Sequence, residues 1–297
     1  MSKKKLIVVV GPTAVGKTSL SIELANFLGT EIVSADSRQF YKELNIGVAT
    51  PTALELSMAK HNLIGHISIH QSYNIADFEK DALKELERIF QEKDYAVLTG
   101  GSGLYVNALC YGVDNMPDVD IEIREELNET FKTQGITPLQ EELKAKDPEY
   151  WEVVDKQNHI RLIRALEVCR QTGKTFTSFR LGGKKTRDFE IIKLGLERKR
   201  ENLLERIYKR VDIMLEEGLV EEAKTLYPFR DLQALNTVGY KELFEYFDGK
   251  VDFSTAIENI KINTRQYAKR QMTWFKKDKN TTWLDAENKI DWKCLDL

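Results

Sequence analysis

The chain has 297 residues and a formal net charge of −3, and hydrophobic and charged residues make up 42% and 31% of it. This composition is ordinary for a soluble globular protein with one large domain or two smaller ones, and no apolar stretch is long enough to span a bilayer. The three cysteines, Cys110, Cys169 and Cys294, are too far apart for a disulfide framework or a C-x-x-C zinc site. We therefore expect a cytoplasmic protein without membrane association.

The small net charge hides a strong separation of charge along the chain. Residues 156–210 contain sixteen basic and six acidic side chains, a net of +10, and residues 261–279 contain seven basic and one acidic, a net of +6. Two basic segments in a mildly acidic protein suit a large anion, such as a nucleic acid, bound on one face. Solvated helix faces paired with the acidic segments explain the same pattern equally well.

The first predicted element is a buried strand, Leu6–Val10, that runs directly into a phosphate-binding pattern. The eight residues of this loop match G-x-x-x-x-G-K-[ST]: Gly11, Pro12, Thr13, Ala14, Val15, Gly16, Lys17 and Thr18. The glycines let backbone N–H groups point at an anion, Lys17 adds a positive charge, and the Thr18 hydroxyl can hold Mg²⁺. The helix expected over Lys17–Leu28 adds its N-terminal dipole to the same site.

Strands and helices alternate through the first hundred residues. Further strands are expected at Glu31–Ser34, Leu63–Ile69 and Tyr95–Thr99, and helices over 52–61, Ala76–Glu92 and Leu104–Cys110. Such alternation is typical of an α/β fold. Together with the phosphate-binding loop, it predicts a parallel sheet flanked by helices, similar to the core of P-loop NTPases.

The character of the chain changes after Gly112. An acidic helical stretch to about Gln134, a helix starting near Asp147 and a basic helix over Asn158–Thr172 predict an all-helical insertion at residues 113–187. The α/β core is then formed by residues 1–112 and 188–297. Within its second part we expect strands at Glu190–Leu196 and Thr282–Leu284, and helices over 200–217, 219–227, 239–247 and 253–276.

Two polar residues follow the ends of predicted strands, where parallel sheets present their functional groups. Asp36 follows the second strand, and Ser102 follows the strand at Tyr95–Thr99, so both are expected beside the phosphate-binding loop. Next to a bound polyphosphate, a carboxylate can hold Mg²⁺ or act as a base, and a hydroxyl can position an acceptor. Without a ligand, Asp36 would be a helix cap and Ser102 an ordinary turn residue.

Cationic side chains on two predicted helices are further candidates. Arg206 and Arg210 are four residues apart and share a helix face, which suits a phosphate clamp or a salt-bridged surface. Arg265, Lys269 and Arg270 alternate with aromatic residues, as in nucleic-acid binders, although a helix that docks its aromatics into the core has the same pattern. The four histidines, His61, His66, His70 and His159, lack supported metal-ligand spacing and are expected to be structural.

Six motifs, taken in order, resemble those of one family, the tRNA dimethylallyltransferases (tRNA isopentenyltransferases). They span nearly the whole chain and are Gly11–Thr18, Ser34–Gln39 with Tyr41, Gly100–Tyr105, Arg161–Glu167, Val238–Glu242, and Thr264–Gln271 with Thr273–Trp274. The resemblance implies transfer of a dimethylallyl group from dimethylallyl diphosphate to N6 of adenosine 37, next to the tRNA anticodon. The chain departs from the family pattern at Ser102, where threonine is usual, and at Arg38, where an apolar residue is commoner.

The resemblance also implies a role for each matching residue. Asp36 would be the general base on N6, with Ser102 hydrogen-bonded near the same group. Lys17, a Mg²⁺ ion on Thr18, and Arg206 or Arg210 would stabilise the leaving diphosphate. Residues matching the family's contacts with the tRNA anticodon stem-loop are Asp36, Ser37, Arg38, Gln39, Ser102, Arg124, Ile160, Arg161, Leu162, Ile163, Arg164, Gly239, Tyr240, Lys241, Arg265, Lys269 and Arg270.

Other functions fit parts of the same pattern. An adenylate isopentenyltransferase, which prenylates free AMP, ADP or ATP, has the same fold but does not need a basic insertion of this size. The phosphate-binding loop alone is shared with small-molecule kinases and nucleotide-switch proteins. For the family function we expect a monomer that binds tRNA, dimethylallyl diphosphate and Mg²⁺.

Overall fold

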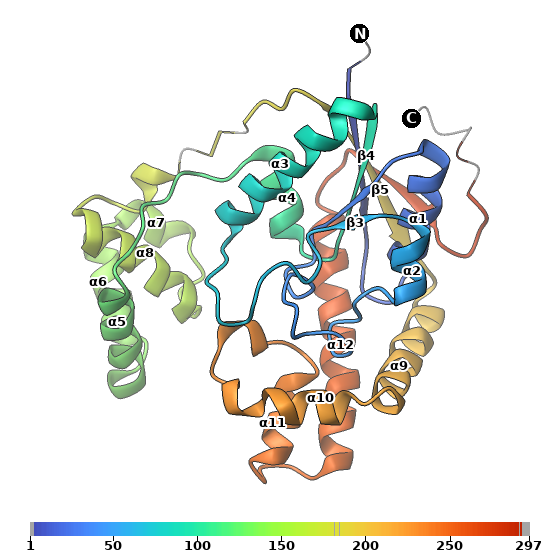
Figure 1. Cartoon of the computed structure of the whole chain (residues 1–297). Helices are drawn as coiled ribbons and strands as arrows, with labels where there is room; N and C mark the ends of the chain where they lie inside the picture. Colours follow the sequence, from blue (N-terminus) through green and yellow to red (C-terminus); the bar gives the residue numbers. More distant parts are fainter. Residues whose placement is uncertain (1–2, 181, 184, 291, 293–297) are drawn as a thin grey trace. The chain divides into compact units, whose positions relative to one another are not determined.

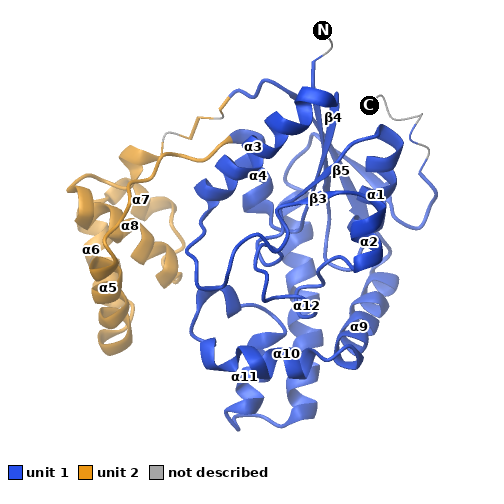
Figure 2. Cartoon of the chain, viewed as in Figure 1, with its two compact units in different colours: residues 1–111, 186–297 blue, residues 112–185 orange. Residues whose placement is uncertain are grey.

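The computed structural model describes residues 3–180, 182–183, 185–290 and 292, so Cys294 lies outside the described residues. The chain forms two compact units, residues 1–111 with 186–297, and residues 112–185 (Figure 2). The boundaries expected for the insertion, 113 and 187, lie one and two residues from those of the second unit. None of the described helices combines the length and apolar character needed to cross a membrane.

The first unit is built on a six-stranded sheet. In spatial order, its strands are β3 (His61–Asn62), β2 (Ile32–Ser34), β4 (Tyr95–Thr99), β1 (Lys5–Val10), β5 (Glu190–Glu197) and β6 (Thr281–Asp285). Every pairing between neighbours is parallel, which confirms the predicted fold class. The central strand β1 is buried from Leu6 to Val10, because both faces of a parallel sheet are covered.

Helices cover both faces of this sheet (Figure 1). Alternate residues of β1 point to opposite faces. Leu6 and Val8 pack with α3 (Ile75–Glu92) and α4 (Gly103–Tyr111), whereas Ile7 and Val9 pack with α1 (Lys17–Leu28), which contacts the short α2 (Ala53–Met58). The loops that follow β1, β2 and β4 therefore meet at the carboxyl edge of three neighbouring strands.

The C-terminal helices of the first unit form a second core. They are α9 (Arg200–Glu216), α10 (Leu219–Leu226), α11 (Tyr240–Phe247) and α12 (Phe253–Phe275). Val211, Leu219, Leu243 and Ile260 bring one buried residue from each helix into a common cluster. The helix α12 continues from this cluster to the sheet, where Phe275 joins the core around Leu6 and Val8. It thereby links the two cores along one side of the site described below.

The second unit is all-helical, with α5 (Ile121–Gln134), α6 (Thr137–Lys146), α7 (Pro148–Val153) and α8 (His159–Thr172). Its own core contains Leu127, Leu139, Leu143 and Leu166. Asp147 is fully buried there and accepts hydrogen bonds from the backbone N–H groups of Tyr150 and Thr177. These bonds compensate for the loss of hydration of the buried carboxylate.

One predicted strand is wrong. Instead of a strand over Leu63–Ile69, the structure has the two-residue β3 followed by a turn. Leu63 and Gly65 have φ of +61° and +56°, left-handed values that interrupt a strand. Ile67 pairs with Tyr41 in an isolated bridge. The helix expected over 52–61 ends at Met58, so that the chain can extend into β3.

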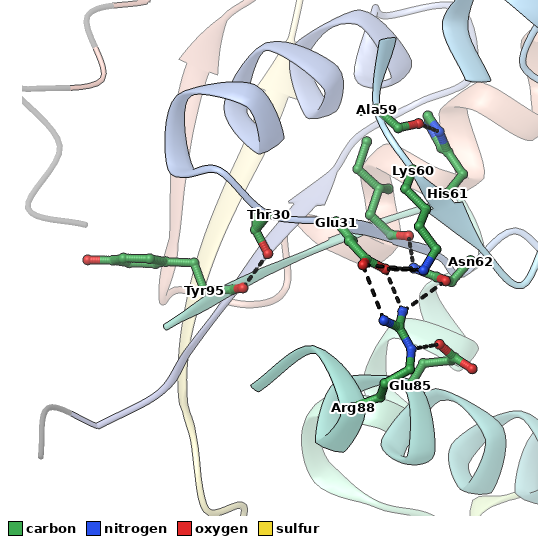
Figure 3. A network of polar contacts seen from close by, with 10 residues as sticks. Thr30, Glu31, Ala59, Lys60, His61, Asn62, Glu85, Arg88 and Tyr95 are labelled. Carbon is green, nitrogen blue, oxygen red and sulfur yellow. Dashed lines mark hydrogen bonds and ion pairs between the residues drawn. The ribbon is translucent and has the colours of Figure 1, made fainter. Parts of the chain in front are cut away.

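A polar network fastens this short edge of the sheet (Figure 3). Glu31, which precedes β2, accepts hydrogen bonds from Arg88 of α3 and Asn62 of β3 and pairs with Lys60. The hydrogen bond from Arg88 is the main reason that the pKa of Glu31 is lowered to about 2, although partial burial opposes the shift. The network ties the edge strand to a core helix through side chains, where backbone pairing is brief.

Candidate active site

The loop between β1 and α1 curls around a space for an anion. Gly11, Ala14 and Gly16 have φ of 150°, 63° and 118°, values that glycine adopts easily and alanine only with strain. A β-carbon at Gly11 would lie 2.7 Å from the Leu196 carbonyl oxygen. Such turns direct successive backbone N–H groups to one side and form an anion-binding nest.

Lys17 folds back over this loop. Its Nζ donates hydrogen bonds to the carbonyl oxygens of Gly11 and Pro12, at 3.0 and 2.8 Å. Burial lowers the pKa of Lys17 to about 8; the charge of Asp36 raises it, and that of Arg210 lowers it. The ammonium is therefore a destabilised cation that an anion in the loop would stabilise.

Two arginines of α9 lie against the same loop. Arg206 Nε donates to the Ala14 carbonyl at 2.8 Å, and the Arg210 guanidinium lies 3.5 Å from Thr13 Oγ1. Burial lowers the pKa of both arginines, and a neighbouring arginine lowers each further, Arg198 for Arg206 and Arg206 for Arg210. This concentration of positive charge favours a polyanionic ligand.

Asp36 and Ser102 lie at the ends of neighbouring strands. The backbone N–H of Ser37 donates to Ser102 Oγ at 3.2 Å, and the two hydroxyl oxygens are 3.1 Å apart. A β-carbon at Gly100 would lie 2.6 Å from the backbone of Ala35. Close backbone approach therefore brings the loop after β2 and the loop after β4 together.

Asp36 combines a turn hydrogen bond with a place in a pocket. Its Oδ1 accepts a hydrogen bond from the backbone N–H of Arg38 at 3.1 Å. Residues 37–40 form a turn and not a helix, so Asp36 is not the helix cap that its sequence context allowed. The side chain also lines a pocket of about 120 Å³ together with Thr13 and Arg210. The turn hydrogen bond holds the carboxylate in place beside this pocket.

The pocket has both charged and apolar lining residues. Asp36, Arg38 and Arg210 supply the charges, and residues 47–49 and 237–239 line it from two loops. The helices α9 and α12 complete the lining with Val211, Met214, Ile260, Thr264 and Tyr267. An anionic head group beside Arg210 with a short apolar tail would match this lining.

The two residues after Ser37 hold the walls of this pocket. The Arg38 guanidinium donates to the carbonyl oxygens of Gln233, Ala234 and Asn236, at 3.0, 3.1 and 3.2 Å. Gln39 Nε2 donates to the carbonyls of Val48 and Ala49, at 3.3 and 3.0 Å. The tRNA contacts that the resemblance implies for Arg38 and Gln39 stay predictions. In the structure both side chains bond to loops around the pocket, and Arg38 also lines it.

The helix α12 also contributes Gln271, the last residue of the motif Thr264–Gln271, for which the sequence predicted no role of its own. Its side chain is 5% exposed; its Oε1 accepts from the Thr13 N–H at 2.8 Å, and its Nε2 donates to the Gly101 carbonyl at 2.9 Å. Tyr267 lies one turn before Gln271 on α12. Burial is the main reason that the pKa of Tyr267 is raised to about 12; the charge of Asp36 also raises it, and the hydrogen bond with Ser102 lowers it. The sequence signal for Gln271 was its place four residues after Tyr267 on a predicted helix. That spacing alone does not indicate a site residue, because the burial of the amide depends on the fold.

Most of the remaining tRNA candidates in the first unit are exposed cations. Lys241 lies in the first turn of α11, and Arg265, Lys269 and Arg270 lie on α12, all with exposed side chains. Gly239 precedes α11 with φ of 102°, and its N–H donates to Glu242 at 2.8 Å. Tyr240 requires a correction: its side chain is fully buried and its hydroxyl donates to Glu222 at 2.6 Å, so it supports the fold.

In the second unit, the candidates divide between surface and core because α8 is amphipathic. Ile160 is 66% exposed, and the Arg161 side chain is also exposed. Arg124 and Arg164 both pair with the buried Glu167. Leu162 and Ile163 were also expected among the tRNA contacts; their side chains are buried in the helical core and are not presented at the surface.

The described residues contain no cluster of three or more His, Cys, Asp or Glu that could hold a metal by itself. The histidines have structural contacts: His61 Nδ1 meets the Ala59 carbonyl, and His66, His70 and His159 pack against aromatic rings. Thr18 lies in the first turn of α1, next to Lys17. A metal at this loop would need most of its ligands from a bound phosphate group and water.

The chain has extensive similarity to named proteins. It is 54% identical over 282 residues to the tRNA dimethylallyltransferase of Christiangramia forsetii, covering 95% of this chain and 93% of the relative. It is 49% identical over 287 residues to the tRNA dimethylallyltransferase 1 of Bacteroides fragilis, covering 97% and 95%.

Solved structures of proteins with the same kind of name are also similar to this chain. The tRNA isopentenylpyrophosphate transferase of Bacillus halodurans superposes with a TM-score of 0.70 at 38% identity, over 98% of this chain and 93% of that one. A eukaryotic dimethylallyltransferase acting on tRNA gives 0.78 at 27% identity, over 95% and 74%. A sequence model described as IPP transferase matches residues 39–278. The chain therefore belongs to the IPP transferase family.

Proposed function

We propose that this chain transfers a dimethylallyl group from dimethylallyl diphosphate to N6 of adenosine 37 in tRNA, giving N6-isopentenyladenosine. The observation that carries the proposal is the pocket that places Asp36 beside Thr13 of the phosphate-binding loop and Arg210. One such pocket can hold an anionic donor and a base for an incoming nucleophile. The names of the close relatives favour tRNA as the acceptor.

The donor's diphosphate would occupy the anion nest. Lys17 and Arg210 carry charges that burial destabilises in the free protein, so both gain stabilisation when an anion binds. Arg210 lines the pocket, whereas Arg206 donates to the Ala14 carbonyl. We therefore assign the diphosphate contact to Arg210 and support of the loop to Arg206. The dimethylallyl tail would lie along Val211, Met214 and Ile260.

The residues of the loop fit a Mg²⁺ ion that is held mainly by the donor. Thr18 would supply one protein oxygen, and diphosphate oxygens and water would supply the rest, as is usual for this ion. When bound, the ion neutralises charge that develops on the leaving diphosphate. Lys17 and Arg210 share that task through their own positive charges.

The acceptor amine is a weak nucleophile because its lone pair is delocalised into the adenine ring. As the allylic carbon–oxygen bond breaks, its electron pair leaves with the diphosphate, and the N6 lone pair forms the new bond to carbon. Asp36 accepts the proton that N6 loses, so that a cationic product does not accumulate. The hydroxyls of Ser102 and Tyr267 lie together and would orient the amine.

Binding of tRNA would use exposed cations. Arg265, Lys269 and Arg270 on α12, with Lys241 on α11, form the candidate phosphate contacts of the first unit, and Arg161 on α8 those of the second. An adenine inside a stacked anticodon loop cannot present N6 to a pocket. The base must therefore turn out of the stack, as in other base-modifying enzymes.

The test combines purified protein, Mg²⁺ and labelled dimethylallyl diphosphate with either tRNA or AMP. We expect label in tRNA and none in AMP. Label in AMP alone would instead identify an adenylate isopentenyltransferase. Absence of transfer together with ATP turnover would identify a small-molecule kinase.

A further inference from the structure

The side-chain amide of Gln271 joins two loops that are distant in sequence. Its oxygen accepts a hydrogen bond from Thr13 N–H, 258 positions away, at 2.8 Å, and its nitrogen donates to the Gly101 carbonyl, 170 positions away, at 2.9 Å. The first loop carries the phosphate-binding nest, and the second carries Ser102. One rigid planar group therefore spans the donor side and the acceptor side of the site.

The fit around this amide is close. Gln271 is 5% exposed, and a β-carbon on Gly101 would collide with its Nε2. Trp274, one turn further along α12, packs against Gly103 so that a β-carbon there would also collide. Tyr267, one turn before Gln271, meets Ser102. A single face of α12 therefore contacts the loop after β4 at three points.

We propose that Gln271 is a positioning residue, which sets the separation between the diphosphate-binding loop and the hydroxyl of Ser102. The inference rests on the proposed function, since it concerns the alignment of donor and acceptor in that reaction. Gln271 touches neither substrate in this account. It acts through Thr13 and Gly101, and its amide offers the one donor and one acceptor that those two backbone groups need.

Misalignment of reacting groups slows transfer more than it weakens binding, because each substrate keeps its own contacts. The Gln271→Met variant keeps the length of the side chain and removes both hydrogen bonds. Gln271→Asn keeps the amide and is too short to span the two loops. Gln91, an exposed glutamine on α3, supplies the controls Gln91→Met and Gln91→Asn.

The experiment measures the single-turnover rate of transfer to tRNA, with dissociation constants for Mg²⁺-diphosphate and for tRNA and the melting temperature. We expect both Gln271 variants to lower the rate by at least about tenfold, with both dissociation constants within about threefold of the wild type. The Gln91 variants are expected to match the wild type. An unchanged rate in folded Gln271→Met, or a loss explained wholly by weaker diphosphate binding, would overturn the inference.

A second measurement applies if Gln271→Met fails to fold. Gly101→Ala inserts a methyl group against the amide, and the shorter Gln271→Asn side chain makes room for it. The rate loss of the double variant should therefore be smaller than the product of the losses of the two single variants. Losses that multiply would contradict coupling through Gly101. If the wild type itself transfers no label, the proposed function fails, and the positioning inference fails with it. This outcome differs from failure of the inference alone, in which the wild type is active and the Gln271 variants are equally active.

Discussion

The Ser37 N–H donates to the Ser102 hydroxyl at 3.2 Å, which joins the residue next to Asp36 to the residue expected to orient the acceptor. The two lie 65 positions apart in the chain and meet because β2 and β4 are neighbours in a parallel sheet. The same sheet places the phosphate-binding loop after β1, the next strand along. The phosphate-binding loop and Asp36, the proposed base, therefore follow strands of the same sheet edge.

Asp36→Asn separates the turn hydrogen bond of this residue from its proposed role as a base. Asparagine still offers an oxygen to the Arg38 N–H, so we expect the fold and tRNA binding to persist. Loss of the base should lower the single-turnover rate by about 10³-fold. Asp188→Asn, the same substitution at an exposed position outside the site, is the control. Full activity in Asp36→Asn would remove Asp36 from the proton transfer.

Lys17 predicts how donor affinity depends on pH. Its pKa of about 8 in the free protein means that the ammonium is charged below that pH and must take up a proton to bind an anion above it. Affinity for dimethylallyl diphosphate should therefore fall as pH rises through about 8, by up to about tenfold per unit. Calorimetric titration measures this dependence.

The control for this prediction is Lys17→Arg, whose guanidinium stays protonated. The ligand's own titration is common to both proteins, so the difference between their pH profiles reports on Lys17. Identical slopes above pH 8 in the two proteins would show that Lys17 does not take up a proton on binding.

Arg161→Glu tests the second unit as a binder of polyanions. Arg161 is exposed on α8, and its reversal should weaken tRNA binding about tenfold while leaving the affinity for dimethylallyl diphosphate unchanged. Lys144→Glu, an equal charge reversal at an exposed position of α6, is the matched control. Affinity for tRNA that does not change with salt concentration in the wild type would contradict the electrostatic argument.

Glu31→Gln tests the network at the sheet edge. The pKa of Glu31 is lowered to about 2 in the folded protein, from an ordinary value of 4.5. The ionised carboxylate therefore stabilises the fold fully at pH values above 4.5, and this stabilisation is lost as the pH falls from 4.5 towards 2. We expect a loss of about 1 kcal/mol in unfolding free energy at pH 7. Denaturant unfolding measures this free energy for Glu31→Gln and for the control Glu92→Gln, the same substitution at an exposed position of α3. A deficit that stays constant down to pH 3 would exclude the ionised pairing as its cause.

The parts of the fold that depend on local pattern could be predicted from the sequence. The apolar run Leu6–Val10 with its phosphate loop, and the helix over 253–276, lie within a few residues of the observed β1 and α12. The strand over Leu63–Ile69 failed because Leu63 adopts a left-handed φ of +61°, which β-propensity does not reveal.

The site was only partly predictable for a similar reason. Asp36 and Ser102 could be placed beside the loop because the ends of parallel strands share one edge. The role of Gln271 depends on two backbone groups that the completed fold brings to it. Arg38 was expected to contact tRNA. Its three hydrogen bonds to the loop at residues 233–236 could not be predicted, because that loop lies almost 200 positions away in the chain.

The most direct test of the central claim compares two anticodon stem-loops that differ at one base. Wild-type protein, Mg²⁺ and dimethylallyl diphosphate are incubated with RNA that carries adenosine or guanosine at position 37, and the nucleosides are identified by mass spectrometry. We expect N6-isopentenyladenosine from the adenosine RNA and no prenylated nucleoside from the guanosine RNA. Equal modification of both RNAs, or of neither, would contradict the claim.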